Sequence, residues 1–387
     1  MPRRSSYPLL LLLALTVPAG RAHSRVWSVD PAGDGDAPTI QAAVDSAGPG
    51  DEIVVEPGIY SWSTQGHSGD YGMVFFASYV GGFTLRSSNG PEETFLDAEF
   101  RGRIMFIQSY NDIVIDGFTF RNGRAPASYD SGGGLIGHLS SPVIRNCVFT
   151  GNSAFYGGGL WYGGVSAPVL EDCVFIDNHA ASGGAVCLVN SSSAAAFSGC
   201  RLEGNSAESR GGGIYAYHYR FEMTGCTLRG NSAGESGGGL CVSRIYPSTV
   251  ERCTFVDNEA PSGGGIHVRY ESDLTVGTSI IAFGHEGGAL GVEPGGGLEA
   301  GCCLLFSNTG GDSIPPGAVD AGNILKVDPQ FCGSRPSGNL YLQSDSPCLP
   351  FNHPVPLPCG RIGAYPAGCG TVGTERTPWG RIKRKER

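Results

Sequence analysis

A block of sequence recurs along this chain, and its period constrains the fold more than any other feature. The first regular copy, Asn146–Leu160, carries a cysteine, then Phe149 and Asn152, and ends in a glycine run. Further copies occupy residues 172–186, 199–214, 225–240 and 252–266. The apolar residue closing each glycine run recurs every 24 to 28 residues, at Leu135, Leu160, Val186, Ile214, Leu240, Ile266 and Leu290. A fixed period of this length predicts a solenoid of stacked coils.

Short runs of β-forming residues fill each repeat, and the repeats show no helical pattern. Three short strands per repeat indicate an all-β parallel β-helix, in which each strand pairs with its counterpart in the next coil. We expect about nine or ten coils across residues 25–308. The 62 glycines among 387 residues recur at fixed repeat positions and therefore indicate turns. A short helix capped by Thr39 and ended by Gly48 is expected to cover the open first coil.

Three repeat positions should fill the interior or join the coils. Cysteines occupy one position at Cys147, Cys173, Cys200, Cys226, Cys253 and Cys303, with Phe118 and Thr278 predicted in the same place. One cysteine per coil cannot converge on a zinc ion, so we interpret these residues as buried apolar filler. A large apolar residue follows two positions later. Asparagines follow five positions after each cysteine, from Asn152 to Asn308, and can form a hydrogen-bonded stack along the rod.

The two ends of the chain differ from the repeats. Residues 1–24 have the basic start, apolar run and small-residue cleavage site of a secretory signal, so we expect a secreted or cell-surface protein without a transmembrane segment. Residues 309–370 break the period and are predicted to form an irregular cap. Its cysteines, Cys332, Cys348, Cys359 and Cys369, are expected to pair among themselves, and three pairings stay open. Residues 371–387 read as a basic, disordered tail. Only 16% of the residues are charged and three are lysine, so the main body of the chain gives no support for nucleic-acid binding.

The repeat motifs resemble known families. Phe-x-x-Asn and Gly-Gly-Ala sequences, such as 149–152 and 183–186, resemble the repeats of polymorphic outer membrane proteins. Residues 39–60 resemble the opening of pectin-lyase-like proteins, which implies a right-handed β-helix. This fold hosts lyases, hydrolases, esterases and adhesins, so the resemblance leaves the function open. The Asn-Thr-Asp and Gly-His-Gly motifs of polygalacturonase-like enzymes do not occur, and Arg-x-Lys occurs only in the basic tail, at residues 381–383. We expect no cofactor or metal site, although Ca²⁺, which pectate lyases bind, stays open.

The strand after each glycine run carries the best candidate site. Strand alternation should point Trp161, Tyr215 and His267 outward, followed by a second outward column with His138, Tyr217 and Arg269. Aromatic faces with polar tips suit stacking on sugar rings. We therefore predict an exported, non-catalytic β-helix that binds a polysaccharide or cell-surface glycan through Trp161, Tyr215, Tyr217, His267 and Arg269.

Two alternatives remain. The same groove could serve a polysaccharide lyase, hydrolase or epimerase, with His138, Tyr217 or His267 transferring protons and Arg269 neutralising a uronate carboxylate. Alternatively, the aromatic residues simply favour exposed strands, and the protein is a passive structural spacer.

Overall fold

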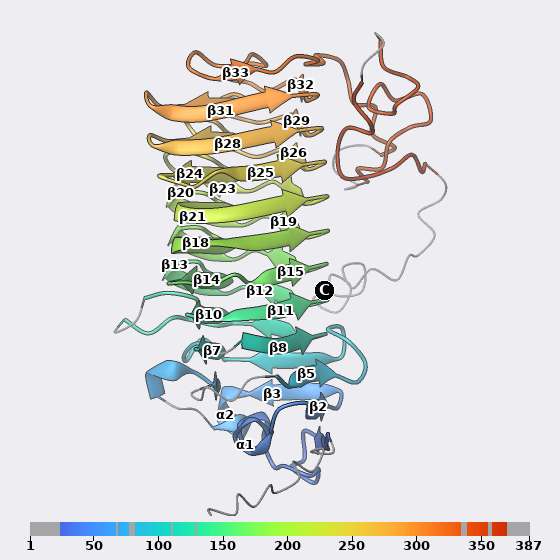
Figure 1. The fold of residues 1–387 in the computed structure, drawn as a ribbon. Helices are drawn as coiled ribbons and strands as arrows, with labels where there is room; N and C mark the ends of the chain where they lie inside the picture. The colour runs from blue at the N-terminus through green and yellow to red at the C-terminus, as the bar shows by residue number, and fades with distance from the viewer. Residues whose placement is uncertain are drawn as a thin grey trace, which may run out of the picture.

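The protein is a rod of stacked parallel strands (Figure 1). The computed structural model describes residues 24–66, 69–76, 82–109, 111–127, 130–333, 339–354 and 358–369. One sheet takes a single strand from each coil and has ten strands, which confirms the expected parallel β-helix of about ten coils. Apart from Ser24, the predicted signal peptide (residues 1–24) lies outside the described residues, as does the predicted basic tail (371–387).

The strands stack in four ladders. The first ladder contains β4 (Val74–Phe76), β7 (Met105–Gln108), β10 (Leu135–His138), β14 (Leu160–Gly163), β24 (Leu240–Ser243), β27 (Ile266–Val268) and β30 (Leu290–Val292). The second contains β1 (Val26–Val29), β2 (Glu52–Val55), β5 (Thr84–Ser87), β8 (Asn111–Asp116), β11 (Ser141–Arg145), β15 (Val169–Glu171), β25 (Ser248–Glu251), β28 (Ser272–Gly277), β31 (Gly296–Gly301) and β33 (Val319–Asp320). The long strands β18 (Val186–Ser198) and β21 (Ile214–Thr224) run through both of these ladders.

The other two ladders complete each coil. The third contains β3 (Gly58–Ser61), β6 (Thr94–Asp97), β9 (Thr119–Arg121), β12 (Val148–Thr150), β16 (Val174–Ile176), β19 (Arg201–Glu203), β22 (Thr227–Arg229), β26 (Thr254–Val256), β29 (Ile280–Ala282) and β32 (Leu304–Phe306). The fourth is short and contains β13 (Ser153–Tyr156), β17 (His179–Ser182), β20 (Ser206–Arg210) and β23 (Ser232–Ala233). This fourth ladder lies between the third ladder of one coil and the first ladder of the next.

Helices occur only near the N-terminal end of the described chain. The expected capping helix is α1 (Ile40–Ser46), with the Thr39 hydroxyl accepting from the Ala42 N–H at 3.1 Å. After β3 come α2 (Trp62–Gln65) and the 3₁₀ turn Gly69–Tyr71, which are too short to show periodicity in sequence. No helix within the described ranges is long and apolar enough to cross a membrane.

Each coil turns at residues with positive φ, and the coil around 172–186 is typical. Asp172 (φ 50°) precedes β16, Asp177 (φ 52°) precedes the buried asparagine, and Gly183 (φ 68°) opens the glycine run. Aspartate, asparagine and glycine adopt this left-handed conformation at low cost. These residues at fixed spacing therefore set the corners of the coil.

The predicted cysteine and aromatic columns fill the interior. Cysteines of the column are buried, and the Cys173 Sγ lies 3.4 Å from the Ile144 carbonyl oxygen. Phe120, Phe149 and Phe175 stack with ring centroids 4.6 and 4.8 Å apart. The prediction of Thr278 in the cysteine position was wrong. Because β26 pairs with β29 as Thr254↔Ile280, Ser279 holds that place and Thr278 forms the corner, with φ 43°.

Buried asparagines form a ladder along the rod, as predicted. The Nδ2 of Asn152, Asn178, Asn205 and Asn231 each donates to the Oδ1 of the asparagine in the next coil, at 2.9 to 3.0 Å. The ladder breaks after Asn258, because Gly284 occupies the asparagine position in the following coil. These bonds fix the start of each fourth-ladder strand.

The predicted Cys-containing C-terminal cap is present, but it packs along the side of the rod. The solenoid continues through β33, which pairs with β31, and the later segment packs against the outer face of the third ladder through Ile280, Leu304, Leu342 and Ile362. The disulfides join Cys302 to Cys359 and Cys332 to Cys369, while Cys348 is free and buried.

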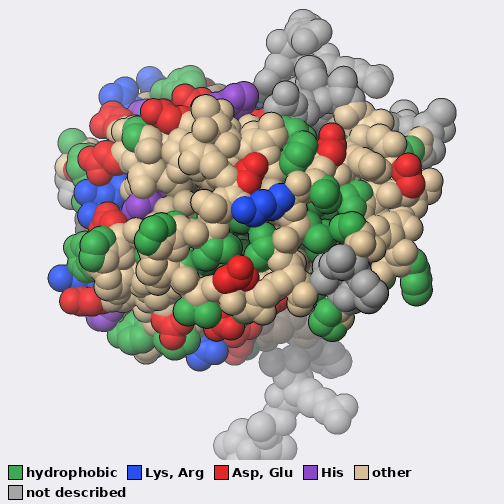
Figure 2. All heavy atoms as spheres, turned by 90° about the horizontal axis from the view of Figure 1, so that it is seen from above, with side chains coloured by type: hydrophobic (Ala, Val, Ile, Leu, Met, Phe, Trp, Pro, Cys, Tyr) green, Lys and Arg blue, Asp and Glu red, His purple; other side chains and the backbone are tan. Residues whose placement is uncertain are grey.

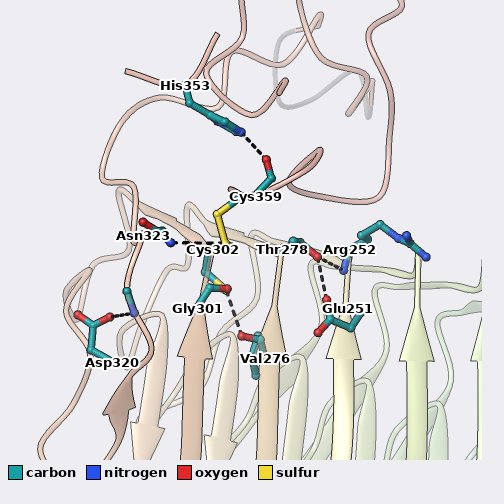
Figure 3. Close-up of a disulfide and its surroundings, with 12 residues drawn as sticks. Glu251, Arg252, Val276, Thr278, Gly301, Cys302, Asp320, Asn323, His353 and Cys359 are labelled. Atoms are coloured by element: carbon teal, nitrogen blue, oxygen red, sulfur yellow. Dashed lines mark hydrogen bonds between the residues drawn. A yellow bond between two sulfur atoms is a disulfide. The ribbon is translucent and has the colours of Figure 1, made fainter. Parts of the chain in front are cut away.

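The expected pairing within the four C-terminal cysteines is confirmed for Cys332 and Cys369 and was wrong for Cys359, which pairs with Cys302, and for Cys348, which is free. Cys303 takes the interior position, so its neighbour Cys302 lies at the outward corner, with φ 53°. There it meets Cys359 as the chain runs back along the third ladder, and Figure 3 shows His353 near the same disulfide. Figure 2 shows the C-terminal end of the rod, beyond β33, with hydrophobic side chains near its centre. Partly buried Val292, Ile314, Ala318 and Ile324 pack there against the core.

Candidate functional site

The first ladder carries the outward column that the sequence predicts. Pairing of β14, β18, β21, β24 and β27 places in register Trp161, Cys187, Tyr215, Cys241 and His267. The predicted direction is confirmed, but the predicted exposure is wrong, because Tyr215 is 7% and His267 4% exposed. Cys187, Tyr215 and Cys241 form a small hydrophobic cluster, and Trp161 packs against it.

Glycine runs explain why this column is covered. A Cβ added at Gly183, Gly237 or Gly263 would lie within 3 Å of the Cβ of the column residue four positions later, respectively Cys187, Cys241 and His267. Only glycine allows the turn to approach so closely. The turn therefore lies directly on the outward column, a consequence that strand alternation alone does not reveal.

A groove of about 400 Å³ remains open between the fourth ladder and the exposed part of the first. Tyr215 and Tyr217 from β21 form part of one wall, with Val189. The fourth ladder contributes the remaining lining residues, which are Phe155, Tyr156, Ala181, Ser182, Ser209 and Arg210. Because both ladders contribute aromatic rings, the groove suits a flat ligand with apolar faces and polar edges.

Phe155 and Tyr156 were missed by the sequence prediction. They are 51% and 39% exposed, and their rings meet edge-on with centroids 4.7 Å apart. Tyr156 is in register with Ser182 of the next coil, so other repeats carry small or polar residues here. The two aromatic residues are a departure from the repeat, and that departure was visible in the sequence.

A second depression, of about 470 Å³, also borders β13, through Ser153, Ala154 and Phe155. Phe155 and Ala181 line both hollows. Phe100, which is 58% exposed, and the charged residues Arg124 and Glu208 also line the second hollow. Phe155 therefore stands on the ridge between the two hollows.

Tyr217 has its hydroxyl fixed by a neighbouring coil. Arg244 Nη1 donates to the Tyr217 hydroxyl at 3.2 Å, and Arg244 also forms an ion pair with Glu271 at 3.2 Å. Next to it, the Tyr246 hydroxyl lies 3.1 Å from His218 Nε2. Phenol and imidazole edges at this end of the groove provide hydrogen-bonding groups for a polar ligand.

His267 and Arg269 form a separate cluster with residues that the sequence prediction did not include. His267 Nδ1 lies 3.0 Å from the Ser262 hydroxyl, and Nε2 lies 3.5 Å from Glu293 Oε1. The same Glu293 oxygen accepts from Arg269 Nε at 2.8 Å. Burial lowers the pKa of His267, although Glu293 opposes this shift. Burial also opposes ionisation of Glu293, but Arg269 and His267 outweigh it and lower the pKa of Glu293.

The remaining predicted residues lie outside the groove. His138, at the end of β10, is half-buried and in register with Gly163, two coils from the groove residue Val189. Trp161 is half-buried and supports the wall through the Cys187–Tyr215 cluster. The groove thus includes Tyr215 and Tyr217 of the predicted set. Among the described residues, no group of three or more His, Cys, Asp or Glu side chains is arranged to hold a metal ion.

Comparisons with known proteins agree on the fold. A family model described as a right handed beta helix region matches residues 82–231 and 184–314, which together cover more than half of the chain. A pectate lyase structure is similar over 89% of this chain and 97% of its own, with a TM-score of 0.55 and 12% identity. At that identity the likeness concerns the fold alone.

Weaker likenesses extend to two other solved structures. Carrot pectin methylesterase has a TM-score of 0.37 and 12% identity, over 78% of this chain and 88% of its own. The A-module of an Azotobacter vinelandii mannuronan C-5 epimerase has a TM-score of 0.36 and 14% identity, over 74% and 86%. Curated protein sequences give no match to the chain.

Proposed function

This chain belongs to the family of proteins with a right-handed β-helix region, and we propose that it binds a polysaccharide in the groove between β13 and β21. The observation that carries this proposal is that Phe155 and Tyr156 of the fourth ladder and Tyr215 and Tyr217 of the first ladder line one groove. Polysaccharides present flat apolar sugar faces edged with hydroxyls, which aromatic side chains with polar tips complement.

The groove supplies enough aromatic surface for specific binding. Stacked aromatic pairs contribute about 0.5–1.5 kcal/mol beyond their buried area, and we take the same contribution for a ring stacked on a sugar face. Removing two rings should therefore weaken binding by about tenfold to a hundredfold, since each 1.4 kcal/mol is a factor of ten. Arg210, which forms an ion pair with Glu235 at 3.1 Å, and the Tyr217 hydroxyl add polar contacts along the same groove.

Binding without cleavage of the sugar chain fits these residues better than lyase, hydrolase or epimerase chemistry. Both ring nitrogens of His267 face groups of the chain itself, Ser262 and Glu293. Arg269 is paired with Glu293, so neutralising a uronate would require breaking that pair. Burial also raises the pKa of Tyr215 to about 12, which makes its phenol a poor proton donor or base near neutral pH.

We further propose that the protein is exported and meets its glycan outside the cell or at the cell surface. The support is the signal-like N-terminal sequence, with Arg3 and Arg4 before the apolar run 9–17. The relationship of the repeats to those of polymorphic outer membrane proteins stays a prediction from the sequence.

The test compares the native chain with the double variant Phe155→Ala/Tyr156→Ser on immobilised neutral and uronate-containing polysaccharides. The variant restores the small residues found in the next repeat, Ala181 and Ser182, so the fold should persist. We expect retention of the native chain on at least one polymer and its loss in the variant. Polymer length is measured in the same samples, with and without Ca²⁺.

Phe351→Ala provides the control, because Phe351 is fully exposed and outside the groove. It should bind like the native chain. Equal retention of the double variant and the native chain would overturn the groove assignment. Cleavage of a polymer would favour the enzymatic alternative, and neither retention nor cleavage would favour the passive spacer.

A further inference from the structure

A serine, a histidine and a glutamate meet at β27: Ser262 precedes the glycine turn, His267 lies in β27, and Glu293 directly follows β30. The Ser262 hydroxyl and His267 Nδ1 are 3.0 Å apart, and Glu293 Oε1 is 3.5 Å from His267 Nε2. Nε2 is buried and makes no hydrogen bond, but the Glu293 carboxylate is the nearest charge to it and attracts a proton there. With the proton on Nε2, Nδ1 accepts the Ser262 O–H. A nucleophile beside a base that a third group orients is the arrangement required for nucleophilic catalysis.

The burial of the three residues suits these roles. His267 is 4% exposed, so water competes little for its ring nitrogens, whereas Ser262 is half-buried and can be reached from outside. The lowered pKa of His267 keeps its imidazole neutral, as a general base must be near neutral pH. Glu293, in turn, is held by Arg269 Nε at 2.8 Å.

The repeat shows that the histidine is specific to this coil. Ser236 occupies the position of Ser262 one coil earlier, and the two residues form a β-bridge. Ser236 faces Cys241, with its Oγ 3.5 Å from the sulfur, where Ser262 faces His267. The same turn therefore provides one serine beside a base and one serine without a base.

We propose that Ser262 and His267 form an acyl-transfer centre that hydrolyses carboxylic esters. Ser262 Oγ bonds to the ester carbonyl carbon while its proton passes to His267 Nδ1. The alcohol then leaves with that proton, and an acyl-serine remains. Water attacks the acyl carbon, its proton passes through His267 to Ser262 Oγ, and the acid is released. Glu293 acts as a positioning residue that stabilises the protonated imidazole.

The location suggests the source of the ester. Ser262 follows Arg210 and Ser236 in one column of bridges, so it lies two coils, or about 10 Å, from the groove residue Arg210. An acyl group carried by a polysaccharide in the groove could reach it. This choice of polymer rests on the proposed function, whereas the ester chemistry does not.

The test uses two small probes, a fluorophosphonate that labels activated serines and p-nitrophenyl acetate. We expect one covalent adduct, located by peptide mass at Ser262, and slow ester hydrolysis that both disappear in Ser262→Ala. Ser236→Ala is the matched control and should react like the native chain. His267→Gln should slow labelling at least a hundredfold, the usual contribution of a general base.

Glu293→Gln tests the positioning role through pH. Glu293 and Arg269 are the charged groups facing His267, and removing the carboxylate lowers the pKa of His267 further. The midpoint of the labelling rate against pH should therefore move to lower pH, which a purely structural role would not cause. Native-like spectra of Ser262→Ala, together with retention on the polysaccharide, show that the variant has folded.

Absence of labelling in the native chain, or equal labelling of Ser262→Ala, would overturn the proposal. Neither result bears on polysaccharide binding in the groove, which is tested separately with the Phe155 and Tyr156 variant. Labelling at Ser262 without retention on any polysaccharide would refute a polysaccharide ester as the substrate but would still support ester hydrolysis by Ser262.

Discussion

Replacing Asn205 by alanine tests the asparagine ladder at its middle. Asn205 is fully buried and makes four side-chain hydrogen bonds. Its Nδ2 donates to Asn231 Oδ1 at 2.9 Å and to the Phe175 carbonyl at 3.0 Å. Its Oδ1 accepts from the N–H and the Nδ2 of Asn178, at 3.0 and 2.9 Å. Alanine removes all four bonds at once.

The expected cost follows from the groups left behind. The Asn178 N–H and the Phe175 carbonyl lose their bonds to the Asn205 side chain in a buried part of the rod. Each buried polar group left without a partner costs about 1–3 kcal/mol. We therefore expect Asn205→Ala to lower the free energy of unfolding by about 3 kcal/mol, and to loosen β17 and β20, which line the groove.

Urea unfolding and amide hydrogen exchange measure this effect. Asn89→Ala is the control, because Asn89 is exposed and its Nδ2 donates only to the Glu93 carboxylate; its cost should stay below about 0.5 kcal/mol. Exchange should accelerate at the Asn178 amide in the ladder variant alone. Equal unfolding midpoints for the two variants, with unchanged protection at Asn178, would refute the view that the ladder holds the fourth-ladder strands.

Three further predictions concern the cap, pH and the thiols. The double variant Cys302→Ser/Cys359→Ser should lower the free energy of unfolding by about 2–4 kcal/mol. It should also speed proteolysis of the C-terminal cap but not of the coils. Equal rates of cap cleavage in the variant and the native chain would contradict the observed docking of the cap. The pKa of His267 is lowered in the folded chain, so as pH falls His267 takes up a proton in the unfolded chain before it does so in the folded chain. The free energy of unfolding should therefore decrease as pH drops below about 6.5, the ordinary histidine pKa. His267→Gln should flatten that part of the urea-midpoint profile. The free cysteines are all buried, and burial raises the pKa of Cys147 to about 12, so a thiol reagent should react only after unfolding.

Much of the fold could be predicted because a solenoid repeats one local solution. Cysteine, phenylalanine and asparagine recur at fixed spacing, and each occupies one position in the coil. The columns that they form lie at the predicted positions. Errors arose where two residues compete for one place. Thr278 was predicted inward where Ser279 points inward, because only the register of the ladder decides between neighbouring residues. Cys303 was placed correctly, but the same register turns its neighbour Cys302 outward, where it forms an unpredicted disulfide.

The candidate site was less predictable, because alternation gives the direction of a side chain but not what covers it. Tyr215 and His267 point outward and are nevertheless buried, since the glycine turns fold over them. Phe155, Tyr156 and Glu293 come from other parts of the coil and meet the predicted residues only in three dimensions. Their proximity depends on how strands of different ladders face each other, which the period does not encode.

Departures from the repeat are therefore the best guide to function in this chain. A residue that matches its column contributes to stacking, and its neighbours in the next coils could replace it. Phe155 and Tyr156 stand where Ala181 and Ser182 suffice in the next coil, so the rod does not need their rings. His267 stands where Cys241 fills the same covered place one coil earlier. Stacking of the coils explains neither the aromatic pair nor the histidine. We therefore infer that Phe155 and Tyr156 serve a ligand in the groove and that His267 serves a reaction at Ser262.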